Sequence, residues 1–310
     1  MNNSKEGFYS RKNIIAPFAI SAIYFLLSWW LIGFKTDQLY LAGVFNFFFF
    51  ASVVSRKFIL GFSIFIVYWI LFDYMKAFPN YKFNEVHIAD LYQAEKYLFG
   101  IHQAQNIVTP NEYWVQHSST FLDILCGFFY LCWIPVPLAF AAYLFFKNKT
   151  LFLSFSVTFV LVNFIGFVGY YIYPAAPPWY IQQFGTGFIP ATAGNTAGLA
   201  RFDAYFGVSI FKNLYAKSSN VFAAMPSLHS SYPVLVLYYG IQKKMGWVNI
   251  FFAAVMVGIW FTAVYSSHHY ILDVLCGIAC AIAGLFIYTK LLQNSAWFRR
   301  FFNYMLRKIS

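Results

Sequence analysis

Charge is what this sequence has least of: Asp, Glu, Lys and Arg make up only 10% of its 310 residues. A soluble domain of this size needs far more surface charge, so the composition excludes a soluble globular protein. Cysteine is also scarce, and the four Cys residues lack the paired spacing and the histidine partners of a zinc site. What is abundant is apolar, with 61% hydrophobic and 24% aromatic residues, and this composition is typical of a membrane protein.

Eight apolar stretches mark the candidate membrane helices. They are residues 14–34, 39–54, 58–75, 120–146, 151–173, 227–242, 247–264 and 270–292. Most approach the roughly 20 residues that cross a bilayer, but the second and sixth are shorter. The first is long for a signal peptide and reads as a membrane helix. We predict an all-α polytopic membrane helix bundle of six to eight transmembrane helices with two long outer loops, residues 76–119 and 174–226.

The basic residues predict the orientation of this bundle. If the N-terminus is cytoplasmic and all eight stretches span, 14 of the 21 Lys and Arg residues lie inside, as the positive-inside rule requires. All six histidines then lie at or beyond the outer boundary, and the net charge of +11 reports topology rather than nucleic-acid binding. Residues 1–310 form a single integral membrane domain in this prediction. Its parts are N-terminal helices with the first outer loop (1–118), a catalytic helix core (119–292) and a basic cytoplasmic tail (293–310).

Two short motifs carry groups suited to phosphoryl chemistry. His269 and Asp273 are four residues apart at the outer start of the last helix, so they share one face, and the carboxylate can fix the imidazole tautomer. His229 follows Ser227 where another helix begins, which offers backbone N–H groups and a hydroxyl to an anion. One histidine could act as nucleophile and the other as acid. The alternative, interfacial packing histidines, is not excluded by spacing, although ionisable residues beside apolar runs favour function.

A resemblance to a known family adds to this interpretation. Pro-Ser-Leu-His ending at His229, followed by His-Tyr-Ile-Leu-Asp ending at Asp273, resembles the second and third signatures of the type 2 phosphatidic acid phosphatase superfamily. The match covers roughly residues 121–277 and leaves the N-terminal hundred residues largely unassigned.

Four further features resemble one branch of that superfamily, the inositol phosphorylceramide synthases of sphingolipid metabolism. They are Ala-Pro-Pro-Trp-Tyr at residues 176–180, Val-Phe-Ala-Ala-Met-Pro-Ser-Leu-His at 221–229, the doubled His268-His269, and Phe-Tyr-Leu-Cys-Trp within residues 121–141.

The resemblance implies a phosphotransferase that works through a phosphohistidine. His269, oriented by Asp273, would attack the phosphorus of a phospholipid donor such as phosphatidylinositol, while His229 protonates the departing diacylglycerol oxygen. A ceramide-like lipid alcohol would then accept the headgroup phosphate. The implied partners are these two lipids, without nucleic acid, and no metal or cofactor is required.

Two departures from the superfamily pattern separate this reading from a lipid phosphate phosphatase. The usual Lys-to-Arg-Pro first signature reads Ala-Ala-Pro-Pro here, and the usual Ser-Arg pair reads Thr262-Ala263. A phosphomonoester or pyrophosphate carries more charge than a diester, so the loss of two cations favours transfer. Hydrolysis remains the main alternative, and a lipid carrier with an inactive site is a third.

Five other residues are candidates for substrate binding. Lys217 and then Arg201 are the nearest replacements for the missing phosphate-binding cations, against a solvated loop charge as the simpler interpretation. Trp179 and Tyr180 could line an acyl or sugar pocket or serve as interfacial anchors. Asp123 could point into the same cavity or cap its helix.

The remaining polar residues favour simpler roles. His87, Asp90 and Glu95 could bind a headgroup or an ion, but solvated loop residues are the simpler interpretation. His268 points to another face from His269, which favours substrate contact over nucleophilic attack. The Phe, Tyr, Lys and Asn bias favours a bacterial inner membrane with the site facing the periplasm, or the lumenal face in a eukaryote. Headgroup identity, acceptor lipid and oligomeric state stay open at this stage.

Overall fold

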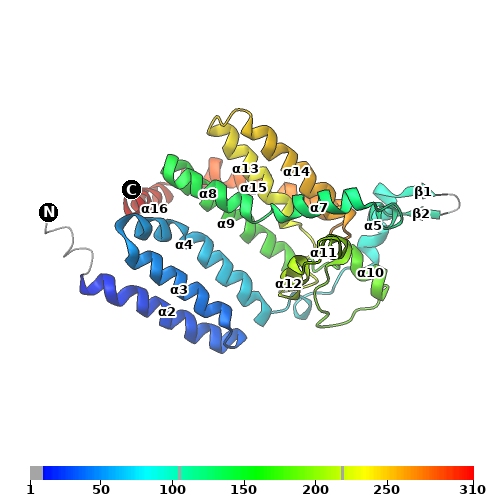
Figure 1. Cartoon of the computed structure of the whole chain (residues 1–310), viewed down its shortest axis with the longest axis horizontal. Helices are drawn as coiled ribbons and strands as arrows, with labels where there is room; N and C mark the ends of the chain where they lie inside the picture. Colours follow the sequence, from blue (N-terminus) through cyan, green and yellow to red (C-terminus); the bar gives the residue numbers. More distant parts are fainter. Residues whose placement is uncertain (1–9, 104–105, 218–219) are drawn as a thin grey trace. The chain divides into compact units, whose positions relative to one another are not determined.

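The computed structural model describes residues 10–103, 106–217 and 220–310, and the regular secondary structure of these residues is almost entirely helical (Figure 1). They divide into two compact units. Residues 10–78 with 296–310 form the first unit, and residues 79–295, which contain every candidate site residue, form the second.

The first unit is a small helical bundle. Its elements are α2 (Arg11–Ile32), α3 (Thr36–Ala51), α4 (Val53–Tyr74), the 3₁₀ turn η1 (Met75–Ala77) and α16 (Ala296–Ile309). Polar side chains join the helices: the Ser28 and Tyr74 hydroxyls lie 2.9 Å apart, and Asn46 Nδ2 donates to Ser21 Oγ at 2.8 Å. Hydrogen bonds of this kind strengthen helix association in lipid. The predicted basic tail, residues 293–310, contains the helix α16.

The second unit holds the longer helices and both loops. Its membrane helices are α7 (Thr120–Leu131), α8 (Pro135–Lys147), α9 (Lys149–Ile172), α13 (Leu228–Gln242), α14 (Val248–Tyr265), α15 (Ile271–Phe286) and the π turn η4 (Ile287–Leu292). Helix α13 packs against α8, α9, α14 and α15, so this 15-residue helix is the centre of the bundle.

The two loops contain short elements of their own. The first has η2 (Asn80–Lys82), α5 (Ala89–Phe99), the antiparallel strands β1 (Ile101–Gln103) and β2 (Asn106–Val108), and α6 (Pro110–Gln116). The second has α10 (Pro178–Phe184), η3 (Ala197–Leu199), α11 (Ala200–Phe206) and α12 (Ile210–Ala216). Helices α5, α10, α11 and α12 gather at one end of this unit (Figure 1). Asn80 ties the loops together, because its Nδ2 donates to Tyr170 O and Phe222 O, both at 2.8 Å.

Six helices within the described ranges are long and apolar enough to cross a membrane. They are Asn13–Ile32, Val53–Ala77, Thr120–Lys147, Lys149–Ile172, Val248–Tyr265 and Ile271–Leu292. The two predicted stretches that were shorter form α3 and α13, of 16 and 15 residues. The predicted all-α polytopic bundle of six to eight membrane helices is therefore confirmed.

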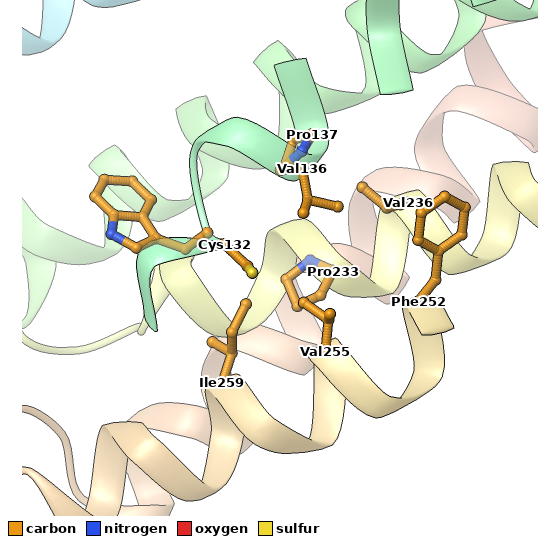
Figure 2. Close-up of a pocket in the computed structure, with 9 residues that line it drawn as sticks. Cys132, Val136, Pro137, Pro233, Val236, Phe252, Val255 and Ile259 are labelled. Atoms are coloured by element: carbon orange, nitrogen blue, oxygen red, sulfur yellow. The ribbon is translucent and has the colours of Figure 1, made fainter. Parts of the chain in front are cut away.

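One predicted stretch has a break that its hydropathy did not indicate. Residues 120–146 form two helices, α7 and α8, separated at residues 132–134. Pro135 occupies the first turn of α8, where its missing N–H costs no hydrogen bond, and a proline at that place ends the preceding helix. Figure 2 shows the small apolar cavity beside this break, bounded by α8, α13 and α14. Cys132, Trp133, Val136, Pro137, Pro233, Val236, Phe252, Val255 and Ile259 line it.

At Gly277, α15 lies tightly against the residue that precedes α13, Ser227. A Cβ added there would lie 2.0 Å from the Ser227 carbonyl oxygen, far inside contact distance. We expect Gly277→Ala to push the two helices apart and to cost about 1–3 kcal/mol of stability. Thermal unfolding of the purified protein measures this as a lower melting temperature. Gly43→Ala is the control, since a Cβ at Gly43 meets nothing within 4 Å, and equal melting temperatures for the two variants would contradict the prediction.

Candidate active site

The two motif histidines meet at one end of α13 and α15. His229 stands in the first turn of α13, and His269 lies two residues before α15 begins. His229 Nδ1 and His269 Nε2 are 3.2 Å apart, which is hydrogen-bond distance. One ring nitrogen must donate and the other accept, so the two imidazoles share a proton between them. His269 is buried with 6% of its surface exposed, and His229 is half-buried.

Asp273 lies in the first turn of α15, four residues after His269. Its Oδ2 is 3.5 Å from His269 Nδ1 and accepts a hydrogen bond from the Tyr270 backbone N–H at 2.8 Å. The carboxylate is fully buried, and within the described part of the chain its Oδ1 has no hydrogen-bond partner. Separations of this size between catalytic groups commonly shorten when substrate binds. The predicted spacing thus brings the carboxylate to the nitrogen opposite the one that faces His229.

A tight turn after α14 holds the doubled histidines. The N–H groups of His268 and His269 both donate to the Ala263 carbonyl, at 3.1 and 2.9 Å. Ser267 adopts a left-handed conformation, with φ of 60°, which few residues other than glycine and asparagine enter readily. The chain therefore reverses within four residues and presents the two neighbouring imidazoles in different directions.

His268 faces the second outer loop rather than the histidine pair. Its Nε2 lies 3.0 Å from the Thr196 carbonyl oxygen, and its ring stacks on Tyr215 with centroids 4.3 Å apart. Burial lowers the pKa of His268 to about 3, and the neighbouring His269 acts in the same direction. The imidazole is therefore neutral at physiological pH, and its Nε2–H donates to the carbonyl.

Two aromatic residues beside His229 were not among the candidates from the sequence. The Tyr130 hydroxyl lies 3.1 Å from His229 Nδ1. The Trp133 ring packs edge-on against the His229 imidazole, with ring centroids 4.2 Å apart. The α7–α8 break places both residues there, because Tyr130 lies in the last turn of α7 and Trp133 lies in the turn that follows. Their only signal in the sequence was the Phe-Tyr-Leu-Cys-Trp stretch.

Three predicted binding residues lie in the framework around the site. Ser227 is fully buried; its backbone N–H donates to Asp273 O at 2.9 Å, and its hydroxyl accepts from Ser230 Oγ. The backbone N–H of Trp179 donates to Ser267 O at 3.0 Å. This bond connects the second outer loop to the turn that carries the two histidines. The Tyr180 hydroxyl donates to the Gly187 carbonyl, so this side chain closes the loop on itself and is not brought to the histidines.

Two of the three remaining predicted residues, Asp123 and Arg201, form an ion pair. Arg201 Nε donates to Asp123 Oδ1 at 2.6 Å, and the Tyr265 hydroxyl donates to the same oxygen at 2.7 Å. One guanidinium nitrogen of Arg201, Nη2, is buried and has no hydrogen-bond partner among the residues that the structure describes. Lys217 caps the C-terminal end of α12 and is exposed. Among the described residues, no group of three or more His, Cys, Asp or Glu side chains could hold a metal ion.

The fold and the paired histidines define a polytopic membrane protein with a buried polar site at one end of its helices. Comparison with protein families agrees: the family model of the PAP2 superfamily matches residues 102–287. The chain belongs to the PAP2 superfamily. The comparison with solved structures finds no match.

Curated relatives are named as lipid synthases. The chain is 44% identical to phosphoinositol dihydroceramide synthase of Bacteroides thetaiotaomicron over 95% of its own length and 97% of the relative's. It is 35% identical to the inositol phosphorylceramide synthase catalytic subunit of Schizosaccharomyces pombe, over 40% of this chain and 30% of the relative. For the corresponding subunit of Saccharomyces cerevisiae the values are 28%, 73% and 55%. The predictions of an enzyme, of this superfamily and of its synthase branch are confirmed.

Proposed function

We propose that this enzyme transfers the inositol phosphate headgroup of phosphatidylinositol to the hydroxyl of a ceramide-type lipid. The single observation that carries the chemistry is the 3.2 Å approach of His229 and His269, with Asp273 on the far side of His269. The substrates are inferred from similarity over almost the whole chain to an enzyme named phosphoinositol dihydroceramide synthase. Dihydroceramide is therefore the first acceptor to test.

The first half-reaction forms a phosphohistidine. With a proton on Nδ1 directed at Asp273, His269 has a free electron pair on Nε2, which attacks the phosphorus. The bond from phosphorus to the glycerol oxygen breaks, and the His229 imidazolium gives its proton to that oxygen, so diacylglycerol leaves. Inositol phosphate is then bound to His269 through a P–N bond.

The second half-reaction runs the same exchange in reverse with another alcohol. His229, now neutral, takes the proton of the acceptor's primary hydroxyl as its oxygen attacks phosphorus. The P–N bond breaks and returns the electron pair to His269 Nε2. The product is the inositol phosphate diester of the ceramide. We place both steps at the outer face of the membrane, which the positive-inside count supports. The composition bias favours the periplasmic face of a bacterial inner membrane, and in a eukaryote this would be the lumenal face.

A transfer assay with purified protein tests the proposal. Phosphatidylinositol labelled in the inositol is supplied in mixed micelles with and without dihydroceramide, and lipid and water-soluble products are separated. We expect labelled inositol phosphoryldihydroceramide only when the acceptor is present. Free inositol phosphate as the main product in both samples would indicate a hydrolase, and no product in either would contradict the proposal.

Phosphate charge needs a cation, and we propose Arg201 for this role. Its unpartnered Nη2 is available to a phosphate oxygen while Nε stays bound to Asp123. A hydrogen bond to a charged group contributes about 1.5–3 kcal/mol, so Arg201→Gln should lower kcat/KM about 10- to 100-fold. Lys217→Gln is the comparison, because Lys217 was the first candidate from the sequence. If Lys217→Gln lowers kcat/KM and Arg201→Gln does not, the assignment passes to Lys217.

A further inference from the structure

The first outer loop supplies a buried carboxylate to the start of α15. Glu95, in α5, has no exposed surface. Its Oε1 accepts from the Ile271 N–H at 2.9 Å, and its Oε2 accepts from the Leu272 N–H at 3.2 Å. The first N–H groups of a helix have no partner within the helix, and each must be satisfied from elsewhere when buried. Glu95 therefore caps the helix on which Asp273 stands.

The first outer loop also binds the backbone of His269 itself and of the last turn of α14. Asn111, in α6, is fully buried, and its Nδ2 donates to His269 O at 2.9 Å and to Val264 O at 2.8 Å. The Asp273 carboxylate accepts from the Tyr270 N–H between these two contacts. Side chains thus satisfy four consecutive backbone positions, from the carbonyl of residue 269 to the N–H of residue 272.

We infer that Glu95 is a positioning residue for His269, acting through the backbone at the start of α15. It reaches no reacting atom. With both oxygens occupied by adjacent N–H groups, it fixes the first turn of α15 and with it the direction of Asp273 toward His269. A small displacement of a reacting group costs a large share of the rate, so this support contributes to kcat. The inference rests on the proposed transfer reaction.

The protonation state of Glu95 decides how well it caps. The ionised carboxylate has two acceptor oxygens and favours the positive end of the helix dipole, whereas the protonated form turns one oxygen into a donor that faces an N–H. The pKa of Glu95 is raised to about 7: burial is the main cause, the two backbone hydrogen bonds act against it, and the nearby Asp273 acts in the same direction as burial. The ionisable groups that interact across this contact are Asp273 and Tyr270 from the α15 side, with Tyr92 and Glu112 from the loop.

Glu95→Gln separates positioning from a merely structural role. The amide imitates the protonated carboxyl, since it keeps one acceptor and sets a donor against the other N–H. The wild-type rate divided by the variant rate should be near 1 at about pH 5.5 and should rise to about tenfold by about pH 8.5, as the wild-type carboxylate ionises. KM for phosphatidylinositol should not change. Ionisable groups that do not interact with Glu95 are common to both proteins and cancel in the ratio.

Glu85→Gln is the matched control, an exposed glutamate of the same loop, and should follow the wild type at every pH. A ratio that does not vary with pH, or a change in KM alone, overturns the inference. If Glu95→Gln does not fold, Glu95→Asp decides: its shorter side chain should lower kcat with KM unchanged, and wild-type kcat refutes the role. Absence of transfer by the wild type at any pH would instead refute the proposed function.

Discussion

His269→Ala should abolish headgroup transfer, with a loss of about 10⁴-fold or more, and should leave the protein folded. The loss is expected to be this large because the variant has no nitrogen to form the P–N bond, and the remaining groups of such a unit recover little of the rate. Donor labelled with ³²P provides a direct measurement. The wild-type protein, denatured quickly without acceptor, should carry acid-labile label, and the variant should carry none.

His102→Ala is the control for His269→Ala, since His102 is exposed on β1. It should keep wild-type transfer and wild-type labelling. Melting temperatures of both variants report whether either has lost its fold. Normal transfer or normal labelling in a folded His269→Ala protein would remove His269 as the nucleophile and with it the proposed two-step reaction.

His229→Gln should slow transfer by about 10²- to 10⁴-fold, the usual contribution of a general acid–base group. The loss arises in both half-reactions, because the same imidazole protonates the leaving alcohol and deprotonates the incoming one. It should depend on the leaving group. A p-nitrophenyl ester of inositol phosphate releases an anion that needs no proton, so formation of the phosphohistidine from this donor should be nearly normal in His229→Gln.

The same donor distinguishes the two histidines. His269→Ala should remain inactive toward the p-nitrophenyl ester, since an easier leaving group cannot replace a missing nucleophile. If His229→Gln is equally slow with both donors, His229 has a role other than acid catalysis. Tyr130 and Trp133, whose contacts orient the imidazole ring, would then be the next residues to vary.

The helices could be predicted from the sequence because membrane spans are defined by local length and hydropathy. The break between α7 and α8 could not, since Pro135 and Pro137 stand in a run whose average hydropathy is undisturbed. Prolines inside membrane helices are common when neighbours satisfy the freed groups, so their presence alone does not predict a break.

The contact between His229 and His269 could be anticipated only in part. The spacing of His269 and Asp273 is local and predicts a shared helix face, whereas the pairing with His229 depended on resemblance to a family. Glu95 was interpreted as a solvated loop residue, and that interpretation is wrong because the side chain is fully buried on the N-terminus of α15. Its partner lies 176 residues later, and nothing in the composition of the loop encodes such a distant contact.

The long sequence separation of these contacts affects when during biogenesis the site can form. Asn111 and Glu95 are synthesised 158 and 176 residues before the backbone groups they bind. Until the last membrane helix of the second unit has been translated and inserted, Asn111 and Glu95 lack the backbone groups around His269 that they bind. We therefore expect activity only after α15 has been inserted. A ribosome that stalls before α15 should leave an inactive fragment in the membrane.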